Sequence, residues 1–163
     1  MNKILADMHT HTIASGHAYA TLTEMCKEAA NKGLEIYGIT EHSSGIPGTC
    51  ADIYFQNLRV VPRDLFGLDL RLGAEINIID YNGTLDLDQK YIDRLDFVIA
   101  GIHSVCYKFG SKEENTAAII NAIKNPNVNI ISHPDDGRCP LDYEALVQAA
   151  KEYHVPVSYT HLT

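Results

Sequence analysis

The stretch Ile4-Leu5-Ala6-Asp7-Met8-His9-Thr10-His11 sets the pattern on which the fold of this chain depends. A short apolar run predicts a β-strand over residues 4–9, and two histidines stand at its carboxyl end. Four more short apolar runs follow, over residues 36–40, 70–75, 97–101 and 128–131. Helical patterns separate them, over residues 23–32, 88–95, 113–124 and 142–153. Strands that alternate with helices predict an α/β fold with a parallel sheet.

Two architectures fit this alternation, a barrel and an open doubly wound sheet. A complete eightfold barrel needs about 250 residues, and the chain has 163, so either architecture leaves it short. Two further features are expected in the connections. A short helix lies near residues 54–60, and the turn dipeptide Asn82-Gly83 predicts a hairpin over residues 76–87.

Composition excludes several classes of protein. The formal charge of −8 leaves no basic stripe to neutralise a nucleic-acid backbone. No apolar run approaches the roughly 18–20 residues of a membrane span, and the apolar stretch near the N-terminus meets the charge of Asp7 too soon for a signal peptide. The four cysteines lie far apart and contain no C-x-x-C pair, which indicates reduced thiols and a cytoplasmic protein.

Histidines gather at the carboxyl ends of the predicted strands. Six of the eight histidines and one glutamate end a strand or follow it closely: His9, His11, His17, His42, Glu75, His103 and His133. In parallel α/β folds the loops at this edge converge on one face. Clustered imidazoles repel one another when charged and need partners when buried. A metal ion binds them in their neutral form and gives each buried nitrogen a partner, so the cluster predicts a metal site.

The spacing within this group indicates how the ligands act. Residues two apart on a strand share a face, so His9 and His11 can reach one ion together. Asp7 points the same way and is expected to hold a ligand imidazole by its second nitrogen. Glu75 closes an apolar strand, and a carboxylate can bridge two cations, which suits a multinuclear centre. Nitrogen and carboxylate ligands without thiolate fit zinc, manganese or iron.

The last seven residues, Val157-Ser158-Tyr159-Thr160-His161-Leu162-Thr163, form a separate case. They back-translate to GTC TCT TAT ACA CAT CTG ACG, which resembles the transposase mosaic-end adapter of shotgun sequencing libraries. Residues 1–156 are therefore expected to be one domain, and residues 157–163 a non-native scar that excludes His161 from the site. The alternative is a native strand, since the composition is strand-like.

These motifs, in their order along the chain, resemble those of the PHP (polymerase and histidinol phosphatase) superfamily, in particular those of its compact single-domain bacterial phosphatases. Besides His17, the motifs that carry the resemblance are Asp7-Met8-His9-Thr10-His11-Thr12, Ile39-Thr40-Glu41-His42, Gly73-Ala74-Glu75, Gly101-Ile102-His103 and Ile131-Ser132-His133-Pro134. The resemblance implies a distorted (β/α)7 TIM-like barrel, here incomplete and lacking its last strands. It also implies three divalent metal ions, with zinc favoured.

The resemblance also implies how the ligands divide among the ions. His9, His11 and Glu75 would hold the first ion. Glu75 would bridge to the second, with His103 and His133, and His17 and His42 would hold the third. Two departures stand out. The Asp-x-His with which the family completes its site is absent after His133, which truncation explains, and Glu41 stands where the family usually has Asp.

The function that the resemblance implies is metal-dependent hydrolysis of a phosphomonoester, with water activated at the multinuclear site. The partner would be a small phosphorylated substrate, with Arg138 as a candidate phosphate contact, and the oligomeric state is left open. Two alternatives remain open. One is a non-catalytic metal-binding fragment, and the other is a PHP nuclease or an enzyme of the histidinol-phosphatase type.

Overall fold

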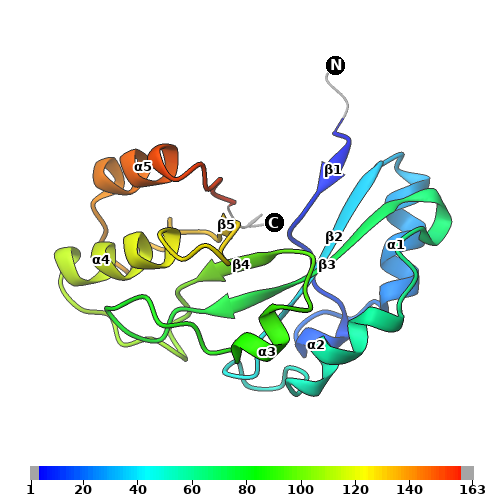
Figure 1. The fold of residues 1–163 in the computed structure, drawn as a ribbon, viewed down its shortest axis with the longest axis horizontal. Helices are drawn as coiled ribbons and strands as arrows, with labels where there is room; N and C mark the ends of the chain where they lie inside the picture. The colour runs from blue at the N-terminus through cyan, green and yellow to red at the C-terminus, as the bar shows by residue number, and fades with distance from the viewer. Residues whose placement is uncertain (1–3, 159–163) are drawn as a thin grey trace.

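Five parallel strands form the sheet, and their order in space follows their order in the chain. The computed structural model describes residues 4–158. The strands are β1 (Ala6–Asp7), β2 (Ile36–His42), β3 (Asp69–Asn77), β4 (Val98–Gly101) and β5 (Ile130–Ile131). The sheet curls as it passes from β1 to β5 (Figure 1). An open doubly wound sheet reverses its strand order at a switch point. The order β1 to β5 has no reversal, so the α/β prediction is confirmed as an incomplete, barrel-like sheet.

Helices occupy most connections between the strands. They are α1 (Leu22–Asn31), α2 (Ile53–Asn57), α3 (Gln89–Ile92), α4 (Lys112–Ile123) and α5 (Tyr143–Glu152), with short 3-10 turns η1 (Ile13–Ser15), η2 (Leu58–Val60) and η3 (Leu65–Gly67). Capping boxes start α1, through Thr21 and Glu24, and α4, through Ser111 and Glu114. Helix α1 packs against β2, and α4 packs against β5 and α5 (Figure 1).

Several element boundaries differ from the prediction. Strand β1 has two residues rather than six, because it pairs with β2 alone at the sheet edge and its residues are exposed. Strand β3 continues two residues past Glu75 to Asn77. The predicted hairpin is reduced to one antiparallel bridge between Ile78 and Leu85. Its predicted turn is present, with Gly83 at a φ of 78°.

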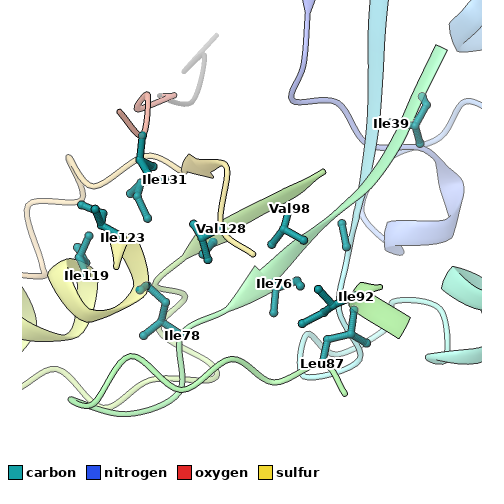
Figure 2. Packing of buried hydrophobic residues seen from close by; sticks show 14 of the residues in the cluster. Ile39, Ile76, Ile78, Leu87, Ile92, Val98, Ile119, Ile123, Val128 and Ile131 are labelled. Carbon is teal, nitrogen blue, oxygen red and sulfur yellow. The ribbon is translucent and has the colours of Figure 1, made fainter. Parts of the chain in front are cut away.

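The hydrophobic core lies between the sheet and the helices. Ile76 and Val98, on neighbouring strands, lie near Leu87 and Ile92, and Ile131 of β5 lies near Ile119 and Ile123 of α4 (Figure 2). These side chains are almost fully buried, and the core they form fixes the carboxyl ends of β3, β4 and β5 relative to one another.

The residues after α5 lie beside β5. Val157 forms a parallel bridge with Ile131, and the Ser158 N–H donates to the Ile131 carbonyl at 2.8 Å. Backbone pairing of this kind does not depend on side-chain identity, so the adapter hypothesis for residues 157–163 stays a prediction, and His161 lies outside the described residues. Within residues 4–158, no helix is both long and apolar enough to cross a bilayer.

Candidate metal centre

Glu75 of β3 forms the centre of the histidine cluster. Its side chain is fully buried, and imidazole nitrogens from four segments face it. Oε2 lies 3.0 Å from His9 Nε2, 3.1 Å from His11 Nε2 and 3.2 Å from His42 Nδ1. Oε1 lies 2.9 Å from His133 Nε2 and 3.4 Å from His103 Nε2. The convergence expected at the carboxyl ends of the strands is therefore present.

The cluster extends to His17, which follows η1 and is exposed. Its ring centroid lies 5.1 Å from that of His11 and 4.9 Å from that of His42. All seven predicted ligands thus lie in one assembly. Three groups have ligand atoms within 4.8 Å of one another: His9, Glu75 and His133; His42, Glu75 and His103; and His11, His17 and His42. In each of the first two groups Glu75 takes part, as a bridging carboxylate would. The groups divide the same residues differently from the expected assignment.

The electrostatics of the cluster favour one negative charge at its centre. Burial opposes ionisation of Glu75, but the contacts with His103, His11, His133 and His9 outweigh it and hold its pKa well below the usual range. Burial lowers the pKa of His42 to about 3, and neighbouring imidazoles add to this effect. At His133 burial is outweighed by the Glu75 carboxylate, which raises the pKa. At neutral pH, therefore, Glu75 is charged and His42 is neutral.

The donor set fits divalent metal ions. Both carboxylate oxygens of Glu75, His42 Nδ1 and His103 Nε2 are buried without a hydrogen-bond partner among the described residues. Buried polar atoms without partners are costly. Neutral imidazole nitrogens and a carboxylate are ordinary ligands of zinc, manganese and iron. Ions placed among these atoms would satisfy all four.

Asp7 occupies a different place from the expected one. Its Oδ1 accepts from the backbone N–H of His9 at 3.3 Å, and its side chain is exposed. The second nitrogen of the His9 ring, Nδ1, lies 2.9 Å from Ser158 Oγ instead. Asp7 thus contacts the backbone beside the ligand and not its ring.

Glu41 has more contacts in the site than its sequence position indicates. Its fully buried carboxylate accepts from the hydroxyls of Thr12 and Ser15, each at 2.5 Å. Ser15 Oγ in turn lies 2.9 Å from His11 Nδ1 and accepts from the His42 N–H at 3.1 Å. In the sequence Glu41 is only a longer substitute for Asp, and Ser15 does not stand out, since a lone serine in a loop carries no readable signal.

A second polar chain supports His103. Its Nδ1 lies 2.7 Å from Oδ1 of Asn77, and the Asn77 amide donates to Asp86 Oδ2 at 2.6 Å. The Ser43 hydroxyl also donates to Asp86, at 2.6 Å. Asn77 lies outside the predicted strand, which ends at Glu75, whereas β3 continues to Asn77. A strand continued by two residues would have placed Asn77 on the same face as Glu75.

An open cleft of about 560 Å³ adjoins the cluster. The residues that line it are His42, Ile46, Ile102, His103, Ser104, Val105, His133, Asp135, Asp136, Gly137 and Arg138. Arg138, the candidate phosphate contact, is one of these residues, and its role stays a prediction. Its guanidinium pairs with Asp136 at 2.7 Å, and this pairing lowers the pKa of Asp136 to about 2. His133, beside it, has a φ of 22°, an uncommon conformation for a residue other than glycine and one that collects at functional sites.

Curated bacterial proteins resemble this chain over most of its length. A "Probable phosphatase" of Acetivibrio thermocellus is 49% identical over 150 residues, which are 92% of this chain and 62% of that protein. A "Probable phosphatase" of Caldicellulosiruptor saccharolyticus is 51% identical over 148 residues, 91% of this chain and 62% of that protein. The chain thus spans less than two thirds of the length of these relatives.

Solved structures share the fold at low sequence identity. A "putative histidinol phosphatase" from Listeria monocytogenes has a TM-score of 0.61 and 14% identity, covering 94% of this chain and 93% of that one. The histidinol phosphate phosphatase of Lactococcus lactis, solved with zinc, L-histidinol and phosphate, has a TM-score of 0.56 and 18% identity, covering 93% and 71%. The PHP domain model matches residues 7–154. The chain, with its strand-end histidines gathered around Glu75, therefore belongs to the PHP domain family.

Proposed function

We propose that this chain carries the metal centre of a phosphomonoester hydrolase. The observation that carries the proposal is the fully buried Glu75 carboxylate, which five imidazole nitrogens from four segments face at 2.9–3.4 Å. Atoms with lone pairs gather in this way to hold cations. His9, His11, His17, His42, Glu75, His103 and His133 are the proposed ligands. The names of the bacterial relatives support a phosphatase.

The proposed metal content is three divalent ions, most favourably zinc. Three groups of ligand atoms are close enough to hold one ion each, and Glu75 belongs to two of them. The zinc in the Lactococcus lactis structure supports this metal, and manganese and iron have suitable ligands as well. When bound, such ions supply Lewis acidity, which activates water and offsets the negative charge of phosphoryl oxygens.

The residues of the chain would then bind and orient the substrate. The cleft beside His103 and His133 admits a small phosphorylated molecule to the metal centre. Arg138 stands at its wall, and a planar guanidinium suits bidentate recognition of phosphate. For Arg138 to act in this way, its ion pair with Asp136 must open or be shared with the substrate.

The proposed location of the protein is the cytoplasm. The free state of all four cysteines, which lie within residues 4–158, supports this location.

The test is a paired measurement of metal content and hydrolysis on the purified chain. Elemental analysis after dialysis against zinc should give about three ions per chain, and Glu75→Gln should retain fewer. p-Nitrophenyl phosphate and histidinol phosphate serve as substrates, and the Acetivibrio thermocellus relative serves as the positive control. Glu28→Gln, which alters only an exposed ion pair with Lys32, is the matched control.

Each outcome decides between the candidates. Zinc-dependent hydrolysis that Glu75→Gln abolishes supports the proposal. Bound zinc without hydrolysis of any monoester overturns the catalytic part and leaves a metal-binding fragment. Hydrolysis of single-stranded DNA that exceeds hydrolysis of the monoesters identifies a nuclease instead.

A further inference from the structure

The chain of contacts from Glu41 to His11 decides where the protons of this part of the site lie. The Ser15 hydroxyl has one proton, and it donates that proton to Oε2 of Glu41 at 2.5 Å. Ser15 Oγ therefore faces its other neighbours as an acceptor. One of them is the backbone N–H of His42, at 3.1 Å.

The other neighbour is the His11 ring, whose Nδ1 lies 2.9 Å from Ser15 Oγ. An oxygen that acts as acceptor requires a proton on this nitrogen. A neutral imidazole with its proton on Nδ1 has its lone pair on Nε2. His11 Nε2 is the atom that lies 3.1 Å from Glu75 Oε2 and 3.3 Å from His9 Nε2. Glu75 Oε2 competes for the ring proton from the Nε2 side, and the Ser15 contact opposes it by holding the proton on Nδ1, which leaves the Nε2 lone pair for the proposed metal centre.

The carboxylate at the start of this chain is held firmly. Glu41 is fully buried, and besides Ser15 it accepts from the Thr12 hydroxyl at 2.5 Å and from the Thr12 N–H at 3.1 Å. It makes no contact with a ring nitrogen of any histidine among the described residues. Its hydrogen-bonded path to an imidazole of the cluster therefore runs through the hydroxyl of Ser15.

We propose that Glu41 is a positioning residue which, through Ser15, fixes His11 in the tautomer whose Nε2 can bind a metal ion. This proposal rests on the proposed function, since it assigns His11 to the metal centre. Without the acceptor, the ring is free to carry its proton on Nε2, where a proton excludes a metal ion. Partners that orient a ligand imidazole in this way typically contribute about 10–100-fold in metal affinity.

Two substitutions separate positioning from simple stabilisation. Ser15→Ala removes the hydroxyl between Glu41 and His11. Thr12→Val removes a hydroxyl that donates to the same buried carboxylate at the same distance but touches no imidazole. Both side chains are almost fully buried, so the two losses of packing and hydrogen bonding are comparable. Ser15→Thr, which keeps a hydroxyl, tests for rescue.

The first readout is the tautomer of His11 in the metal-free chain above neutral pH. Long-range ¹H–¹⁵N correlation spectra distinguish a protonated Nδ1 from a protonated Nε2, and His11→Gln assigns the signals. We expect Nδ1–H in the unmodified chain and in Thr12→Val, and a loss of this preference in Ser15→Ala. An Nε2–H tautomer in the unmodified chain overturns the proposal, whether or not Ser15→Ala folds.

The second readout is zinc affinity, measured by competition with a chromogenic chelator. Ser15→Ala should bind zinc about 10–100-fold more weakly, Thr12→Val should bind within a few-fold of the unmodified chain, and Ser15→Thr should recover most of the loss. Equal losses in Ser15→Ala and Thr12→Val would reduce Glu41 to a structural role. An Nδ1–H tautomer in a chain that binds no zinc supports the positioning contact and overturns the proposed function alone.

Discussion

Nε2 of His133 lies 2.9 Å from Oε1 of Glu75, although β3 and β5 are separated in the sheet by β4. The side chains meet because Glu75 lies on β3 and His133 follows β5, both at the carboxyl ends of parallel strands. A carboxylate in this position can serve ions on both sides of itself, so it is the residue on which the cluster depends most.

Glu75→Gln should therefore lower the zinc content of the chain more than any single histidine substitution. The amide keeps the volume but cannot bridge two ions as an anion. In a thermal scan, saturating zinc at about 100 times its Kd should stabilise the unmodified chain by about 2.7 kcal/mol, and this gain should be smaller in the variant. An equal zinc-dependent rise in Tm for both proteins would contradict the central role of Glu75.

Gly101→Ala should destabilise the protein and disturb the site together. An added Cβ would overlap Oγ of Ser132 and would lie 3.5 Å from Oε1 of Glu75. Overpacking of this kind costs about 1–3 kcal/mol, which urea denaturation can measure. Gly137→Ala is the control, because its Cβ would meet no atom within 4 Å. If both variants unfold at the same urea concentration as the unmodified chain, the close approach at Gly101 is unimportant.

Acidification should destabilise the metal-free chain through His42. Its pKa of about 3 in the folded protein lies below the ordinary value of 6.5. As pH falls from 6.5 toward 3, the unfolded chain binds a proton at this residue that the folded chain does not, so the free energy of unfolding decreases. Between pH 6.5 and 5 the decrease is on the order of 2 kcal/mol.

Thermal scans in EDTA at pH 7 and pH 5 measure this effect. In His42→Gln, the fall in Tm over this interval should be smaller than in the unmodified chain. His133 has the opposite effect, because its pKa is raised in the folded protein. The stability that it contributes is fully present below its unfolded-state pKa and is lost as the pH rises through its folded-state pKa. A Tm that falls equally in both proteins would show that His42 does not set the pH dependence.

Asn77→Ala should weaken metal binding at His103. The amide oxygen lies 2.7 Å from His103 Nδ1, and loss of such a partner costs about 10–100-fold in metal affinity. Asn121→Ala, which alters an exposed amide that donates to the Tyr81 carbonyl, is the control. Chelator competition should show a loss for Asn77→Ala alone, and unchanged affinity in both variants would exclude a supporting role.

Residues 157–163 are expected to be absent from the natural protein. Sequencing of the source DNA across codon 157 tests this prediction directly. A natural reading frame that differs from Val157 onward would support the adapter origin, and the Ser158 contact with His9 would then belong to this chain alone. A natural frame that encodes these seven residues would overturn it.

The fold could be predicted from the sequence because its signals are local. Short apolar runs between helical patterns place β2 and β4 to within a few residues, and the capping residues Thr21 and Ser111 stand where α1 and α4 begin. The length of β1 could not be predicted in this way. Its apolar residues Ile4 and Leu5 match a strand but lie at an exposed sheet edge, where only tertiary pairing decides its extent.

The metal centre could be predicted as a set of residues but not as an arrangement. Six histidines and Glu75 are recognisable because each ends a predicted strand or follows one closely in the next loop. The contacts of Ser15, Asn77 and Asp86 depend on loop conformations, and no spacing rule encodes them. The contact of Asp7 with the backbone N–H of His9 could not be predicted, because strand periodicity gives the direction of a side chain but not which nearby donor it accepts from.

The agreement between strand order and chain order also bears on synthesis by the ribosome. Each strand of β1 to β5 can pair with the one made just before it, so the sheet can grow as the chain emerges. Both residues that face Oε1 of Glu75, His103 and His133, are made after the strand that carries it. A nascent chain thus exposes the carboxylate before these two nitrogen ligands exist. Release of residue 133 from the exit tunnel is therefore the earliest moment at which all seven proposed ligands are available together.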